Sequence, residues 1–182
     1  MIRLTHAPFA LPLKHPFTIA RGTVTIQDTF IVQVGEGDQL GYGEATTNDY
    51  YDATLGNLAA AVESVRPLLA EASLAEDSDG RRLAALLTAL STRLAATPFA
   101  LCSLDLALHD LWARLQGEPL HVLWSLDPAA GPLSNFTIGI DRVAVMVAKL
   151  AEVAEWPIFK IKLGTAQDLD IIRELRRHTD RP

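Results

Sequence analysis

Two lysines separated by one residue are the most informative chemical feature of the sequence, in Phe159-Lys160-Ile161-Lys162-Leu163-Gly164. Side chains alternate along a strand, so both lysines would project from one face, with their alpha carbons ~6–7 Å apart. Phe159, Ile161 and Leu163 would take the opposite face, where helices of a βαβ layer would cover them. Two ammonium groups this close in a poorly hydrated interior disfavour each other's charge. A lysine kept neutral in this way can act as a general base.

The same Lys-x-Lys pattern also has an ordinary structural interpretation, which the residues alone leave open. Lysines on a strand often mark a solvated face or protect a sheet edge from aggregation. The context favours the chemical interpretation, because a strand of a parallel βαβ unit is normally buried on both faces. The pair therefore predicts a strand whose lysines face an enclosed interior.

Other chemically capable residues lack the spacing of a catalytic or metal site. The five histidines, at positions 6, 15, 109, 121 and 178, show no metal-ligand spacing, and a single cysteine excludes an intrachain disulfide and a cysteine-based zinc site. Cys102 is expected to fill the core. Asp105 lies in an apolar helical stripe and is expected to be a buried carboxylate bonded to backbone or to a cap. The 41–45 segment, Gly-Tyr-Gly-Glu-Ala, lacks the helix start of a dinucleotide-binding loop and is interpreted as part of a hairpin turn.

The elements that must position these residues begin with strands. Residues 29–34 alternate, with Phe30, Val32 and Val34 on one face. A glycine-containing turn joins this run to a second strand at 40–45, and residues 2–11 predict a third. The segment 13–22 is too irregular to assign and is expected to be a mobile loop.

Helical spacing follows the strands. Apolar residues predict a helix over 55–69, disturbed near its end by Pro67, and a second helix over 83–94. Pro98 opens a third helix in its first turn, and Gly117 ends it. Three strands followed by three helices predict a segregated α+β unit.

The pattern changes again after residue 132. It predicts a strand at 133–140, a helix at 143–153, a strand at 158–163 and a further helix from Gln167, which is a β-α-β-α order. A parallel sheet of two strands leaves open edges and an uncovered core. We therefore expect either that the chain continues in the intact protein or that another segment completes the sheet.

The composition is that of an ordinary globular protein. Among 182 residues, 49% are hydrophobic and 21% charged, with Lys+Arg 16 against Asp+Glu 22 and a formal net charge of -6. This acidic balance without a basic cluster argues against nucleic-acid binding, and a small-molecule partner is expected instead. No segment approaches the ~18 consecutive apolar residues of a membrane span, and no secretory signal is apparent, so a cytoplasmic location is expected.

Four segments, in this order, resemble the enolase superfamily in its muconate-lactonizing branch. They are residues 16–22, 41–45, 103–111 and 159–164. The Ile-Ala-Arg-Gly sequence at 19–22 and the strand at 134–140 look most like dipeptide epimerases of the L-Ala-D/L-Glu type. The resemblance implies an α+β capping domain over residues 1–120, a three-stranded antiparallel meander plus helices, whose early loop closes over substrate. Residues 121–182 would be the first βαβα units of a modified (β/α) TIM-like barrel, which typically has ~250 residues.

The resemblance also implies roles for four residues. Lys162 would match the acid/base lysine, and Lys160 the neighbour that keeps it neutral and contacts the substrate carboxylate. Thr137, at the end of the first barrel strand, would line the pocket, and Arg21 is the candidate for the distal carboxylate of the substrate. The metal ligands and an opposing lysine are expected beyond residue 182. The 182-residue chain by itself, as an amino-terminal half, is therefore expected to be inactive.

The implied reaction is the epimerisation of a dipeptide such as Ala-Glu, by 1,1-proton transfer at the α-carbon, with Mg²⁺ stabilising an enediolate. Muconate cycloisomerase and o-succinylbenzoate synthase of the same branch stay alternatives, because both would keep the lysine pair. A non-catalytic, stand-alone module that binds a partner is a third alternative. The exact substrate, its stereochemistry and the formation of a homo-oligomer stay open at this point.

Overall fold

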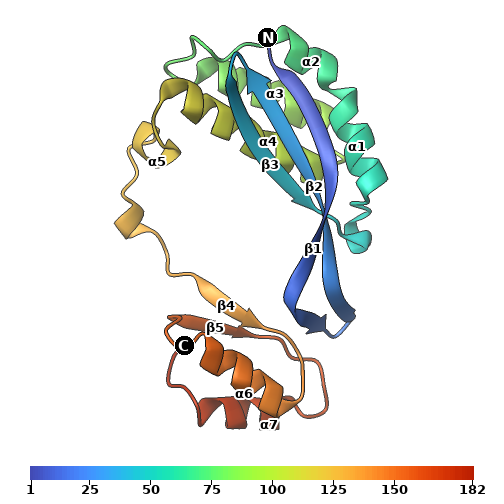
Figure 1. Ribbon diagram of the computed structural model, residues 1–182, viewed down its shortest axis with the longest axis vertical. Coiled ribbons are helices and arrows are strands. Elements are labelled where there is room, and N and C mark those ends of the chain that lie inside the picture. Colours follow the sequence, from blue (N-terminus) through green and yellow to red (C-terminus); the bar gives the residue numbers. More distant parts are fainter. The chain divides into compact units, whose positions relative to one another are not determined.

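A computed structural model describes residues 1–182 and divides them into two compact units (Figure 1). The first, here called the sheet unit, contains Met1–Leu11 and Gln27–Pro128. The second, here called the strand-helix unit, contains Pro12–Ile26 and Ala129–Pro182. Pro12–Ile26 is called the hairpin tip below. No helix in either unit combines the length and apolar character needed to cross a bilayer.

The sheet has three strands in the order β1-β2-β3: β1 (Arg3–Ile19), β2 (Gly22–Glu36) and β3 (Gln39–Thr46). β2 and β3 pair antiparallel, as predicted, with Val34 opposite Gly41. The expected irregular loop at 13–22 is wrong, because β1 and β2 continue through it as one long hairpin closed by a two-residue turn, Ala20-Arg21. The segment is a two-stranded ribbon with no continuously buried face, so the alternation used to detect strands is missing there.

The predicted helices are present, with one break. The structure contains α1 (Leu55–Ser64), α2 (Arg66–Glu71), α3 (Arg81–Arg93), α4 (Pro98–Gln116) and the short α5 (Leu120–Leu123), with single 3-10 turns at Asp49–Tyr51 and Pro128–Ala130. The single helix expected over 55–69 is two helices, because the chain breaks at Val65 and Pro67 occupies the first turn of α2. Proline fits that position, where its missing N–H costs no helical hydrogen bond.

The core of the sheet unit lies between the sheet and its helices, which cover one face (Figure 1). Phe30, Val32 and Val34 are fully buried against leucines of α4. The 41–45 segment is the middle of β3, which confirms the strand predicted at 40–45, whereas its interpretation as part of a turn is wrong. A Cβ at Gly41 would collide with the carbonyl oxygen of Ala107, and one at Gly43 with that of Ser103. These glycines therefore let the backbone of α4 lie directly on β3.

Two expectations about α4 are wrong. Cys102 is exposed, and the side chain of Asp105 is 50% exposed and pairs with Nδ1 of His109 at 2.6 Å. The buried side of α4 is formed by Ser103, Ala107 and Leu111, among others. Cys102 and Asp105 lie about 100° or more around the helix from that line, so apolar neighbours in sequence did not indicate burial.

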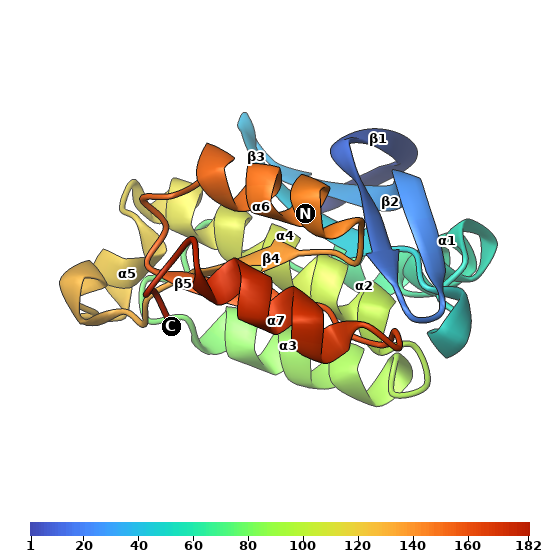
Figure 2. The ribbon, with the colours of Figure 1, turned by 90° about the horizontal axis from the view of Figure 1, so that it is seen from below.

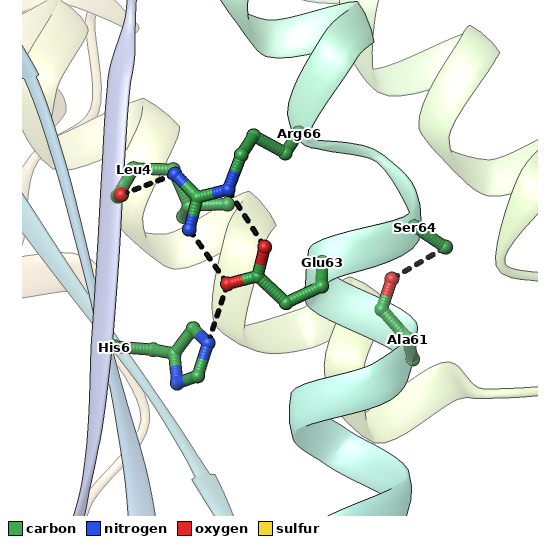
Figure 3. Close-up of polar contacts among 6 residues, drawn as sticks. All are labelled: Leu4, His6, Ala61, Glu63, Ser64 and Arg66. Atoms are coloured by element: carbon green, nitrogen blue, oxygen red, sulfur yellow. Dashed lines mark hydrogen bonds and ion pairs between the residues drawn. The ribbon is translucent and has the colours of Figure 1, made fainter.

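A polar cluster joins β1 to the helices of the sheet unit (Figure 3). The carboxylate of Glu63 accepts hydrogen bonds from Arg66 Nε at 2.7 Å and Nη2 at 2.6 Å, and lies 2.7 Å from His6 Nε2. Arg66 Nη1 also donates to the carbonyl oxygen of Leu4 at 2.7 Å. Glu63 thus connects strand β1 to α1 and α2 through charge-assisted hydrogen bonds.

The strand-helix unit has the predicted β-α-β-α order: β4 (Asn135–Ile138), α6 (Val143–Glu152), β5 (Ile158–Ile161) and α7 (Asp168–Arg176). β4 and β5 pair parallel, and Thr137 is the register partner of Lys160. Both helices lie on one side of the two strands (Figure 2). Their shared core is small and centres on Ile138, Met146, Leu150, Ile171 and Leu175.

Candidate active site

The two strands of the strand-helix unit have chemically different faces. The face toward α6 and α7 is apolar and is formed by Phe136, Ile138, Phe159 and Ile161. Thr137 and Lys160 alternate with these residues and lie side by side on the other face. Lys162 directly follows β5, and its backbone N–H donates to the carbonyl oxygen of Ile138 at 3.0 Å. This bond continues the pairing of the two strands to Lys162, and the predicted alternation would place its side chain on the same face as that of Lys160.

This polar face is open within residues 1–182. Lys160 is exposed, whereas Thr137 and Lys162 are half-buried. The enclosed interior predicted for the lysine pair therefore stays a prediction. The predicted burial of Leu163 is wrong, since its side chain is 43% exposed. β5 ends at Ile161, and the chain then bends at Gly164 (φ 140) instead of continuing the strand.

Each strand is followed by a loop that an aspartate organises. After β4, Asp141 accepts hydrogen bonds from Lys149 Nζ at 3.0 Å and from the backbone N–H of Arg142 at 2.8 Å. After β5, Asp168 accepts from the backbone N–H groups of Thr165 at 2.8 Å and Gly164 at 2.9 Å. These bonds hold the pKa of both carboxyls below the usual range, chiefly the Lys149 bond for Asp141 and the Thr165 bond for Asp168. The loops at the carboxyl ends of both strands are thus held in defined conformations.

The hairpin tip rests on these two loops (Figure 1). The backbone N–H of Ile140 donates to the carbonyl oxygen of Thr18 at 2.9 Å. A Cβ added at Gly139 would lie 3.0 Å from the backbone nitrogen of Thr18, and one at Gly164 would lie 2.8 Å from the Cβ of Ala20. Arg21 is exposed in the turn next to Ala20. The structure therefore brings the turn containing Arg21 to the same edge as Lys162.

This arrangement presents cationic and hydroxyl groups that could contact a small anion. The carboxyl ends of parallel strands form the usual binding edge of (β/α) folds, and here that edge carries amines, a hydroxyl and a nearby guanidinium. Within residues 1–182, no group of three or more His, Cys, Asp or Glu side chains is placed to hold a metal ion. The residues present do not by themselves form a metal centre.

Comparison with known proteins identifies the family. Residues 1–124 match the family described as "Mandelate racemase / muconate lactonizing enzyme, N-terminal domain". The chain belongs to this family. The match covers the sheet with its helices and includes the whole hairpin tip. The α+β capping fold expected from the sequence is thereby confirmed.

Proteins similar to this chain include an L-Ala-D/L-amino acid epimerase from Flavobacterium johnsoniae, 38% identical over 98% of this chain and 51% of that protein. An L-Ala-D/L-Glu epimerase from Bacteroides thetaiotaomicron is 34% identical over 100% of this chain and 46% of its own length. The crystal structure of a dipeptide epimerase from Methylococcus capsulatus, complexed with Mg and L-Arg-D-Lys, is 30% identical with a TM-score of 0.80, over 98% of this chain and 50% of that one. The chain spans about half the length of the curated relatives it matches.

Several residues of this family member were not singled out from the sequence. Thr165-x-x-Asp168 has the spacing of a capping box before an amphipathic helix, a signal that could have identified the loop after β5. Asp141 and Gly139 had no comparable signal. Gly139 matters only because the hairpin tip lies against it, and that contact joins segments more than 100 residues apart in the sequence.

Proposed function

We propose that this chain forms the capping domain, residues 1–120, and the first barrel strands, residues 121–182, of a dipeptide epimerase. The observation that carries the proposal is the position of Lys162, at the carboxyl end of β5, next to the edge on which the hairpin tip rests. Relatives that align with nearly the whole chain are named epimerases of L-Ala-D/L-amino acids and L-Ala-D/L-Glu, which supports a dipeptide substrate.

In the proposed reaction, Lys162 Nζ removes the proton from the α-carbon of the second dipeptide residue. The electron pair of the C–H bond moves into the adjacent carboxylate and forms an enediolate. Protonation of the opposite face of the α-carbon then gives the epimer. Lys160 contacts the substrate carboxylate, while Thr137 lines the pocket.

Arg21 is the proposed ligand of the distal carboxylate of a substrate such as Ala-Glu. Its guanidinium offers donors in a fork that matches a carboxylate, and its turn lies at the edge where β5 ends, just before Lys162. Substrates differ among the relatives, since the Methylococcus capsulatus protein holds L-Arg-D-Lys. The acidic dipeptide is therefore a proposal that depends on Arg21.

The proposal includes Mg²⁺, because the solved relative holds Mg beside its dipeptide. When bound, such an ion would stabilise the negative charge of the enediolate. We place its ligands, and the acid/base group on the opposite face of the substrate, outside residues 1–182. Formation of a homo-oligomer stays a prediction.

The test uses the full-length protein with L-Ala-L-Glu and L-Ala-D-Glu in D₂O, followed by NMR. We expect deuterium at the α-carbon of the second residue and conversion of each dipeptide into its epimer. Replacing Lys162→Met should reduce exchange at least about 100-fold for one of the two dipeptides, which is the lower range for loss of a general base.

Arg173→Met is the matched control, because it also replaces a cation by methionine, at an exposed site of α7 where Arg173 pairs with Asp170. It should leave both exchange rates unchanged. Exchange of both dipeptides at the wild-type rate in Lys162→Met would show that the base is another residue. A wild-type protein that exchanges no dipeptide would refute the epimerase assignment.

A further inference from the structure

An ion cluster attaches the hairpin tip to α6 inside the strand-helix unit. Lys14 Nζ and His15 Nε2 both contact the same oxygen of Glu152, Oε2, at 2.7 and 3.0 Å. Lys14 and His15 belong to β1, whereas Glu152 is the last residue of α6, 137 or more positions away in the sequence. The contact therefore joins the hairpin tip to the body of the unit that carries Lys160 and Lys162.

The position of Glu152 within its own helix is electrostatically unfavourable. The last turn of a helix carries the partial negative charge of its unpaired carbonyl groups, so a carboxylate there is repelled. Lys14 and His15 compensate for this repulsion. Hydrogen bonds from Lys14 first, and from His15, lower the pKa of Glu152 to about 2, so the carboxylate is charged at neutral pH. A glutamate at this position has its favourable partners on the hairpin and not on its own helix.

Other contacts of the tip are close approaches to the two strand-end loops. They include the Ile140 to Thr18 hydrogen bond and the close packing at Gly139 and Gly164. Such contacts define where the tip rests, but they bury little apolar surface, and Phe17, Thr18 and Ile19 are only half-buried. An ionic contact at the edge of the tip can therefore change how often it lifts from the strand ends.

We propose that Glu152 is a positioning residue, which acts through Lys14 and His15 to keep the hairpin tip seated on the loops that follow β4 and β5. The effect of Glu152 on turnover rests on the proposed function, because Arg21, the proposed substrate ligand, and Ala20 are in this tip. Exposed ion pairs are individually weak. A lid that is nearly balanced between two states still responds to a weak contact with a severalfold change in population.

Glu174 of α7 provides a matched control in the same unit. Its carboxylate also pairs with one permanent cation and one histidine, Arg177 at 2.7 Å and His178 at 3.2 Å. Both partners lie at the end of its own helix segment, three and four residues further along the chain. Removing the charge of Glu174 therefore changes a similar ion cluster without releasing the hairpin tip.

The experiment compares Glu152→Gln and Glu174→Gln in the full-length protein by hydrogen exchange and steady-state kinetics. In the absence of substrate, Glu152→Gln should speed exchange of amides in 12–26 by about threefold or more, a readout independent of activity. It should raise KM for the dipeptide by a similar factor while kcat changes less than about twofold. Glu174→Gln should do neither.

Two further outcomes separate this inference from the proposed function. Unchanged exchange of 12–26 in Glu152→Gln overturns the positioning role, even if the wild-type protein epimerises dipeptides. Faster exchange of the tip in a protein that epimerises no dipeptide supports the Glu152 contact and overturns the function. The double variant Lys14→Met with Glu152→Gln should show the same exchange rate of amides in 12–26 as Glu152→Gln alone, because both substitutions remove the same contact. A further increase of the exchange rate in the double variant would contradict the proposal.

Discussion

Glycines bring two backbones together in both units, but with different energetic surroundings. In the sheet unit, Gly41 and Gly43 let α4 lie on β3, and the contact is enclosed by fully buried residues such as Phe30 and Leu104. In the strand-helix unit, Gly139 and Gly164 let the hairpin tip lie on the strand ends, where most of the neighbouring side chains are exposed or half-buried. A glycine at a close backbone contact can therefore support either permanent packing or a contact that opens. The amount of apolar surface buried around the contact determines which of the two occurs.

The largest expected effect tests the permanent contact. In Gly43→Ala, the new Cβ would overlap the carbonyl oxygen of Ser103 and lie 2.8 Å from the backbone nitrogen of Ala107. Neither backbone atom can move without displacing α4 from the core, so the free energy of unfolding should fall by about 3 kcal/mol. Urea denaturation followed by circular dichroism measures this loss.

Gly56→Ala is the control for that prediction. Gly56 lies in α1, and a Cβ there meets nothing within 4 Å. Alanine has the better helix propensity, so this variant should equal the wild type or be more stable by up to about 1 kcal/mol. If Gly43→Ala were as stable as Gly56→Ala, α4 would not rest on β3 through its backbone.

A smaller and more local effect is expected at the second contact. Gly164 has φ 140, a conformation that alanine rarely adopts, and a new Cβ would lie 2.8 Å from the Cβ of Ala20. Gly164→Ala should cost about 1–3 kcal/mol of backbone strain. Because the hairpin tip can move away, we expect faster hydrogen exchange in 12–26 and little change in the amides of α4.

Gly37→Ala separates strain from displacement of the tip. Gly37 also has positive φ, 57, but a Cβ there meets nothing within 4 Å. Gly37→Ala should therefore lower stability without changing exchange of the hairpin tip. If the amides of 12–26 exchanged at the same rate in Gly37→Ala and Gly164→Ala, glycine would be required at position 164 only for its backbone conformation.

The smallest effect concerns Glu63, which attaches β1 within the sheet unit as Glu152 does within the strand-helix unit. Hydrogen bonds from Arg66 first, and from His6, lower the pKa of Glu63 from 4.5 to about 2. A depressed folded-state pKa contributes stability above pH 4.5 and loses it as the pH falls toward 2. Since the side chain is 43% exposed, solvent screening limits this contribution to under about 1 kcal/mol.

Urea unfolding at pH 7 and pH 3 measures this contribution. Wild-type protein should lose more stability between the two pH values than Glu63→Gln, which has no carboxyl group to protonate. If Glu63→Gln lost as much unfolding free energy between pH 7 and pH 3 as the wild type, the loss would come from other carboxylates.

The order and type of most elements could be predicted from the sequence, because burial of one face imposes a period. Phe30, Val32 and Val34 alternate since one side of β2 faces the core, and the leucines of α3 and α4 repeat at helical spacing for the same reason. The lysine pair was detectable on the same principle, as a polar interruption of an apolar strand. The 13–22 segment was not detectable, since neither face of that ribbon is continuously buried.

The candidate site was predictable in its residue types and not in its assembly. Local periodicity correctly predicted that Thr137 and Lys160 lie on strands of a β-α-β unit, with Lys162 directly after the second strand, and it needs only neighbours a few residues away. Tertiary structure alone decided that the turn containing Arg21 lies at the end of those strands and that Glu152 meets Lys14 and His15. These contacts join residues separated by more than 100 positions, and nothing in the local pattern encodes which distant backbone will approach a given glycine or carboxylate.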